Sequence, residues 1–237
     1  MNAPAIPIVA LDVSSGADAL ALVSRLGSTC RFYKVGSELF TSEDGSRVVK
    51  EIIATGADVF LDLKFHDIPN TVRKAARAAA AIGARLLTVH ASGGRAMLEA
   101  AREGAGERCG VLAVTVLTSL DRDALGRAWG RDVTDMEAEV VRLAALAVEA
   151  GLHGVVCSGK ELAALRRAHG ERLAPLVPGI RLVGGDTQDQ VRVVTPEDAV
   201  RLGARYLVLG RAVTAAPDPR QAMETVLAEM ATARDRS

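Results

Sequence analysis

The stretch VFLDLKFHDIPNTVRKAARAAAAIGARLLTV (Val59–Val89) contains a strand, a helix and a second strand in order. Apolar residues run through Val59–Leu63 and Leu86–Val89, and the segment Val72–Ile82 between them has helical character. Gly83 follows the predicted helix, at a position where a left-handed helix cap suits glycine. The stretch therefore predicts one strand-helix unit followed by the strand of the next.

The same pattern extends over the 237 residues. The short apolar runs that predict strands are Ile6–Leu11, Phe32–Val35, Val59–Leu63, Leu86–Val89, Val111–Leu117, Gly154–Cys157, Leu176–Ile180 and Tyr206–Leu209. The stretches of helical character between and after them are Ala17–Leu26, Ser46–Thr55, Val72–Ile82, Arg95–Glu103, Asp135–Ala150, Glu161–His169, Pro196–Leu202 and Pro219–Ala233. The predicted strands are apolar on both faces, as parallel strands covered by helices are.

These repeats favour one fold class. The early strands begin about every 25 to 27 residues, a plausible length for a strand-helix unit. Gly56, Gly83, Gly151 and Gly203 each precede a predicted strand and are expected to cap a helix. Eight units in a chain of this length predict a (β/α)8 barrel, an α/β fold, as a single domain over residues 1–237. The alternative is a doubly wound open sheet.

Composition excludes several classes of function. The formal net charge is zero, and the chain has no block of like charges and no apolar run of 18 residues. We therefore expect a soluble protein without nucleic-acid or membrane partners. The N-terminal residues resemble a first strand rather than a signal peptide, and Cys30, Cys109 and Cys157 are too widely spaced to indicate a disulfide framework or a metal site. A cytoplasmic location is expected.

The end of the third predicted strand carries an unusual concentration of charge. Asp62 and Lys64 lie two residues apart, so on a strand they project from the same face, and Asp67 follows in a loop. An alternating set of charges can remain ionised away from water through mutual attraction, although an ordinary salt bridge would also place Asp62 beside Lys64. Only five of the 29 basic residues are lysines, and Lys34 and Lys64 both lie at strand ends. Unlike arginine, a lysine can donate its proton.

Other polar residues follow the remaining predicted strands. In a (β/α)8 barrel, reactive groups come from the carboxyl ends of different strands, and phosphate often binds after strands seven and eight. Gly210-Arg211 suits a phosphate, because glycine admits backbone N–H groups and a guanidinium binds two oxygens at once; a solvated surface arginine is the alternative. The residues that this rule gathers at one rim are Asp12, Lys34, Asp62, Lys64, His90, Thr118, Arg181, Gln190, Gly210 and Arg211.

Three further segments have open interpretations. His66 invites assignment as a general base, but Lys64 and Asp67 beside it already supply acid-base chemistry. His90 is expected to be a packing or rim residue. The long stretch from Thr118 to Thr134 is predicted to hold an active-site loop, and a candidate lid, before its helix.

These residues resemble the orotidine 5′-phosphate decarboxylase family, whose enzyme makes UMP in pyrimidine biosynthesis. DLKFHDIPNT (Asp62–Thr71) is similar to the family signature, and FYKVG, VHASGG, LTS and PGIR occur in the expected order from Asp12 to Arg211. The resemblance implies a (β/α)8 barrel that works as a homodimer without a metal or an organic cofactor. Arg181-Leu182 departs from the Arg-Pro pair of many bacterial members.

The resemblance also implies roles for individual residues. Lys34, Asp62, Lys64 and Asp67 would form a charged set in which Lys64 protonates C6 and Asp67 serves the neighbouring subunit. Asp12 and the partner's Thr71 would bind ribose, Thr118 would lie near the pyrimidine, and Arg181 would lie close to the phosphate. Gln190, Gly210 and Arg211 would hold that phosphate. The rest of the signature is also predicted to line the substrate site: Leu63, Phe65, His66, Ile68, Pro69 and Asn70.

Two alternative functions remain open from the sequence. A sugar-phosphate decarboxylase or aldolase of the same superfamily can share the Asp-x-Lys-x-x-Asp pattern of Asp62, Lys64 and Asp67 but uses a magnesium ion. The Ile-Pro-Asn-Thr continuation at 68–71 argues against it. A non-catalytic nucleotide-binding or assembly protein could have kept the barrel, although the intact charged set argues against that function.

Overall fold

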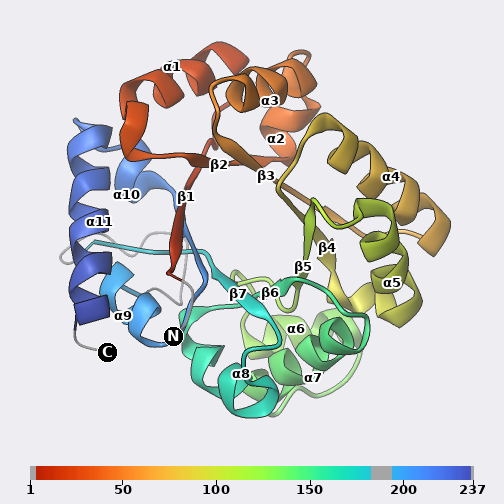
Figure 1. Cartoon of the computed structure of the whole chain (residues 1–237). Coiled ribbons are helices and arrows are strands. Elements are labelled where there is room, and N and C mark those ends of the chain that lie inside the picture. Colours follow the sequence, from red (N-terminus) through yellow and green to blue (C-terminus); the bar gives the residue numbers. More distant parts are fainter. Residues whose placement is uncertain (1–3, 183–193, 236–237) are drawn as a thin grey trace.

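The computed structural model describes residues 4–182 and 194–235, which form a closed barrel of eight parallel strands in the order β1 to β8 (Figure 1). Strands that neighbour one another in sequence pair in parallel, and β8 pairs with β1. The strands are β1 Ile6–Ala10, β2 Phe32–Gly36, β3 Asp58–Phe65, β4 Leu86–His90, β5 Gly110–Val114, β6 Gly154–Val156, β7 Ala174–Val177 and β8 Tyr206–Leu209. The predicted (β/α)8 fold is confirmed, and the open sheet is excluded.

Helices form a ring around this barrel (Figure 1). They are α1 Gly16–Leu26, α2 Ser37–Thr41, α3 Gly45–Ala54, α4 Pro69–Ile82, α5 Gly94–Ala105, α6 Arg122–Trp129, α7 Met136–Glu149, α8 Leu162–His169, α9 Pro196–Arg201, α10 Arg211–Thr214 and α11 Pro219–Asp235, with short 3-10 turns at Gly27–Thr29, Ala91–Gly93 and Gly159–Glu161. The glycines expected to end helices, Gly56, Gly83, Gly151 and Gly203, all have positive φ angles, between 67° and 103°.

Two apolar layers result from the alternation of side chains along each strand. One fills the barrel and includes Phe32, Phe60, Leu86 and Leu112, while the larger one lies between the strands and the helices. Phe32, Phe60 and Leu86 precede Lys34, Asp62 and Thr88 by two positions, so these three polar residues face inward one level higher. The apolar layer thus forms a floor beneath a polar carboxyl end.

The structure differs from the predicted elements in several places. β5 ends at Val114 rather than Leu117, and both the backbone N–H and the hydroxyl of the next residue, Thr115, donate to the Val156 carbonyl, at 3.3 and 2.8 Å. β7 ends at Val177, and Ile180 forms only an isolated bridge with Val194. The short helices α2, α6 and α10 were not predicted.

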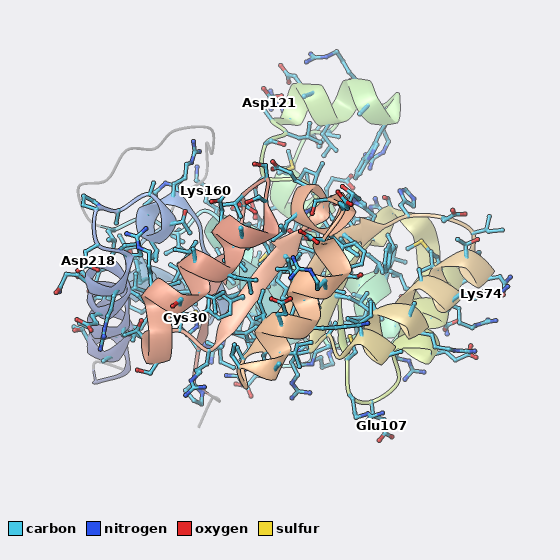
Figure 2. The ribbon with its side chains drawn as sticks, turned by 90° about the horizontal axis from the view of Figure 1, so that it is seen from above. Cys30, Lys74, Glu107, Asp121, Lys160 and Asp218 are labelled. Atoms are coloured by element: carbon cyan, nitrogen blue, oxygen red, sulfur yellow. The ribbon has the colours of Figure 1, made fainter. Side chains whose placement is uncertain are left out.

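Helix α6 occupies the middle of the segment that was predicted to be a loop. Asp121 caps its start by accepting a hydrogen bond from the Ala124 N–H at 2.7 Å, and Gly130 ends it with φ 64°. Leu125 is its only buried residue, so little of this helix packs against the rest of the described chain. Figure 2 shows α6, which begins after Asp121, standing clear of the barrel at the end opposite Glu107.

Two further predictions can be compared with the described residues. Cys30, Cys109 and Cys157 are all buried and free. Across 4–182 and 194–235, no helix is long and apolar enough to cross a membrane.

Candidate active site

Four charged side chains form an alternating row at the carboxyl ends of β1, β2 and β3. The Lys34 Nζ lies 2.7 Å from Asp12 Oδ1 and 3.7 Å from Asp62 Oδ2, and the Lys64 Nζ lies 2.9 Å from Asp62 Oδ1. The side chains of Lys34 and Asp62 are 11% and 15% exposed, whereas that of Lys64 is 37% exposed. Both lysines of the row therefore contact Asp62. Because the Lys64 side chain is partly exposed, a ligand can contact it.

The backbone around Lys64 is irregular. Lys64 has φ 50° and is the only residue other than glycine with a positive φ in the described chain. Four steps along β3, from Leu61 to Phe65, match only two along β4, from Leu87 to Val89, so β3 bulges at this point. The sequence predicted that Asp62 and Lys64 share a face through regular alternation. Their side chains do contact each other. However, the β3 strand bulges between them, which costs about 1–3 kcal/mol of backbone strain and changes the direction of the Lys64 side chain.

A pocket of about 260 Å³ opens above this row. Its floor is the apolar layer of the barrel, including Ala10, Phe60, Leu176 and Val208. An apolar floor keeps the local dielectric low and strengthens the field of fixed charges. Eight of the predicted site residues line the pocket: Asp12, Lys34, Asp62, Lys64, Thr118, Arg181, Gly210 and Arg211.

The remaining residues of the signature lie elsewhere in this chain. Leu63 and Phe65 pack against the apolar layer between the strands and the helices, on either side of the bulge at Lys64. Pro69 begins α4, with Asn70 and Thr71 exposed in its first turn, although the predicted helix started at Val72. Ile68 is the most exposed large apolar side chain described, at 66%. None of these lines the pocket, and Gln190 lies outside the described residues.

Asp67 does not join the charged row in this chain. Its Oδ1 accepts a hydrogen bond from the Ile68 N–H at 2.6 Å, and the residue is exposed. Within the part of the chain that the structure describes, it forms no ion pair with Lys34 or Lys64. The carboxylate and the exposed Ile68 therefore occur together on the outer surface of the β3–α4 loop.

The two histidines near the signature lie against each other. The ring centroids of His66 and His90 are 5.5 Å apart, and neither ring lines the pocket. Burial, reinforced by the nearby His66 and Lys64, lowers the pKa of His90 below its usual value. His90 thus fits the predicted rim position, and the structure gives His66 no contact with the charged row.

Sequence reasoning missed several residues of the site. Gly36 approaches the row closely, because an added Cβ there would lie 3.2 Å from Lys34 Nζ. Thr88 is fully buried inside the barrel and bonds both Asp62 and the Lys64 backbone. The available signal was a polar residue inside the apolar run LLTVH. The rule that selects residues at strand ends does not include Thr88, because it lies within the strand. The pocket walls also include Val116, Leu117, Pro178 and Gly179.

A second cavity, of about 1060 Å³, lies at the other end of the barrel. It opens between α8 and α9, next to the residues that precede β6, β7 and β8, and is lined by arginines including Arg166, Arg172 and Arg205. Arg172 is bonded to carbonyls at the end of α8, and Arg205 to the carbonyl of Pro4. This cavity is remote from the charged row, so the smaller pocket is the candidate active site.

The fold and the charged pocket together define a (β/α)8-barrel enzyme whose reactive groups lie at the carboxyl ends of its strands. Comparison with known proteins makes the assignment specific. The chain belongs to the orotidine 5′-phosphate decarboxylase / HUMPS family, whose sequence model matches residues 6–226.

Individual relatives agree with this assignment. The curated orotidine 5′-phosphate decarboxylase of Moorella thermoacetica is 48% identical over 231 residues, covering 94% of this chain and 91% of that protein. The one from an Anaeromyxobacter species is 50% identical over 222 residues, covering 92% and 95%. The crystal structure of the Lactobacillus acidophilus enzyme is 37% identical with a TM-score of 0.84, covering 97% of this chain and 99% of that one. These relatives are carboxy-lyases, and the chain is an enzyme of that class.

Proposed function

We propose that this protein decarboxylates orotidine 5′-phosphate to UMP and CO2, the last step of de novo UMP biosynthesis, through one catalytic domain that spans residues 1–237. The observation that carries the proposal is the pair formed by Lys64 and Asp62. They lie 2.9 Å apart, above an apolar floor and on the same pocket as Arg181 and Arg211. Close relatives named for this activity support the same choice of substrate.

The charged row matches what the reaction requires. Loss of CO2 leaves an electron pair on C6, a ring carbon with poor delocalisation, so the ammonium of Lys64 stabilises the developing carbanion and then transfers its proton to C6. Asp62 holds Lys64 in place and stands beside the departing carboxylate, where its charge disfavours the bound substrate relative to the transition state. Lys34 is hydrogen-bonded to Asp12 and ion-paired with Asp62, so it orders the row, and together with Asp12 it contacts the ribose hydroxyls.

Binding energy from the phosphate organises the site. Arg181 and Arg211 line the pocket on the side of β7 and β8, and an added Cβ at Gly210 would meet no atom within 4 Å. A phosphate can therefore approach the backbone of Gly210 while a guanidinium binds two of its oxygens. Thr118 lies on the pocket wall that follows β5, where the pyrimidine would sit. Gln190 is proposed as a further phosphate ligand from the resemblance alone.

Replacing Arg211 by alanine is expected to weaken substrate binding. The loss of charge-assisted hydrogen bonds worth about 1.5–3 kcal/mol should lower kcat/KM about 10- to 100-fold, mainly through KM. Steady-state kinetics would measure this change. Arg220→Ala, on the exposed surface of α11, removes the same charge away from the pocket and should leave the kinetics unchanged. An Arg211→Ala enzyme with unaltered KM would remove Arg211 from the phosphate site.

The substrate and the independence from metal are tested in one assay. The purified protein should release CO2 and form UMP from orotidine 5′-phosphate, and the rate should be the same in excess EDTA, because the charged row supplies the electrostatic stabilisation. A magnesium-dependent sugar-phosphate decarboxylase or aldolase would instead lose activity in the chelator and act on sugar phosphates. Ligand binding by folded protein without turnover would favour a non-catalytic nucleotide-binding role.

The proposed enzyme is a homodimer whose active sites are shared across the interface. The support is the position of Asp67, which is exposed and apart from its own charged row, next to Ile68 at 66% exposure. An exposed apolar side chain beside functional polar residues is typical of an interface. In this arrangement Asp67 and Thr71 of each subunit complete the partner's site. A cytoplasmic location, and the lack of nucleic-acid or membrane partners, stay predictions.

A further inference from the structure

The fully buried hydroxyl of Thr88 closes a ring of hydrogen bonds around Lys64. The Lys64 backbone N–H donates to Thr88 Oγ1 at 2.9 Å, and the Thr88 hydroxyl lies 3.0 Å from Asp62 Oδ1. The same Oδ1 accepts from Lys64 Nζ at 2.9 Å. Lys64 is therefore held at both its backbone and its ammonium by one hydroxyl and one carboxylate oxygen.

The direction of each hydrogen bond in this ring follows from chemistry. A backbone N–H can only donate, so Thr88 Oγ1 must accept from Lys64, and its single proton is left for Asp62. The ring then needs an acceptor at Asp62 Oδ1, which the carboxylate supplies. Because Oδ1 takes both the hydroxyl and the ammonium, Oδ2 remains on the side of Lys34, 3.7 Å away.

The ring coincides with the irregular backbone of β3. Lys64 has φ 50°, a conformation that a side chain such as lysine adopts only when surrounding contacts over-determine it. Thr88 is suited to this purpose because its branched Cβ restricts χ1 and its position on β4 is fully buried. The bond from Lys64 N–H to Thr88 spans the bulge at the point where regular pairing between β3 and β4 is interrupted.

We propose that Thr88 is a positioning residue for the proton donor. Through its hydroxyl it holds the left-handed backbone of Lys64 and the orientation of Asp62, so that the Lys64 ammonium reaches the reacting carbon. Thr88 does not itself line the pocket and is not a catalytic residue. This inference rests on the proposed function, because the role assigned to Thr88 is defined by the proton that Lys64 transfers.

Thr88→Val tests the proposal by removing the hydroxyl and keeping the shape. We expect kcat for orotidine 5′-phosphate to fall about 10- to 100-fold with KM little changed, since misplacement of a reacting group by about 1 Å can cost that much. Thr88→Ser retains the hydroxyl and should restore kcat to within a few-fold of the wild type. A mere packing role would predict the reverse order, with the valine variant the more active.

Thr115 supplies a matched control. It is also a buried threonine, at 4% exposure, and its hydroxyl donates to the Val156 carbonyl at 2.8 Å rather than to the charged row. Both Thr115→Val and Thr88→Val remove a buried hydrogen bond and should lower the melting temperature, but Thr115→Val should leave kcat near the wild-type value. An equal loss of kcat in both variants would overturn the specific role of Thr88.

A measurement independent of turnover separates this proposal from the proposed function. Amide hydrogen exchange at Lys64, followed by NMR, should accelerate in Thr88→Val and remain slow in Thr88→Ser. If the wild type turns over and Thr88→Val keeps both full kcat and slow exchange at Lys64, the role of Thr88 is refuted and the proposed function stands. Folded wild-type protein without turnover would refute the proposed function, with the exchange result still reporting on the hydrogen bond.

Discussion

Lys64→Ala is expected to lower kcat for orotidine 5′-phosphate by at least about 10⁴-fold. Proton donation contributes about 10²- to 10⁴-fold and a positioned charge about 10²- to 10³-fold, and the alanine removes both at once. Asp62 would also lose the ammonium that lies 2.9 Å from its Oδ1, so its neighbours would be Lys34, 3.7 Å from Oδ2, and the Thr88 hydroxyl. Single-turnover kinetics at saturating substrate would measure the chemical step directly.

Two variants sharpen this experiment. Lys64→Arg keeps a positive charge but cannot release a proton, so a large loss of kcat in that variant as well would separate proton transfer from charge. Lys50→Ala, on the exposed face of α3, removes a lysine far from the pocket and should behave as the wild type. Substantial turnover by folded Lys64→Ala enzyme would show that another group protonates the product.

Mixing two inactive variants is expected to restore activity. Lys64→Ala and Asp67→Ala homodimers should each be nearly inactive, because every site lacks either its lysine or the partner's aspartate. In a mixed dimer, one site lacks both residues and the other is intact. With random exchange at equal amounts, about half of the dimers are mixed, so about a quarter of wild-type activity should return.

The subunit exchange must be verified independently. Native mass spectrometry of subunits with different tags would give the fraction of mixed dimers, and the recovered activity should rise in proportion to it. Each variant incubated with itself under the same conditions serves as the control. Verified mixed dimers without activity would place Asp67 in the site of its own subunit, in conflict with its exposure and with the ion pairs of Lys34 and Lys64, which the described residues form without it.

The repetition of strands and helices could be read from the sequence because it depends on local patterns. Apolar runs of strand length, helical spacing and glycines at helix ends are properties of neighbouring residues, and they predicted the barrel and most element positions. The short helices were not predicted, since α2, α6 and α10 have only five, eight and four residues, too few to establish a helical period. β5 was predicted too long because the apolar run continues to Leu117, whereas the length of the strand is set by its pairing with β6, which stops at Val114 and Val156.

The candidate site was predictable to the extent that its residues stand at strand ends. Asp12, Lys34, Asp62 and Lys64 were chosen by that rule, and the structure joins all four in one row. Thr88 and Gly36 were not chosen. The sequence around Thr88 does not show whether its hydroxyl bonds Asp62 or is merely buried, and the sequence around Gly36 does not show that its backbone lies close to Lys34.

The sequence by itself determined the fold class, the charged residues and the chemistry that those residues can perform. Only the tertiary structure decided how they are used: that Lys64 stands on a bulge with φ 50°, that Thr88 bonds both its backbone N–H and Asp62, and that Asp67 turns away from the charged row. The physical reason is the range of the interactions. Periodicity and capping act over a few residues, whereas the bonds that aim Lys64 connect β3 to β4 across 24 and 26 residues and form only once the barrel has brought them together.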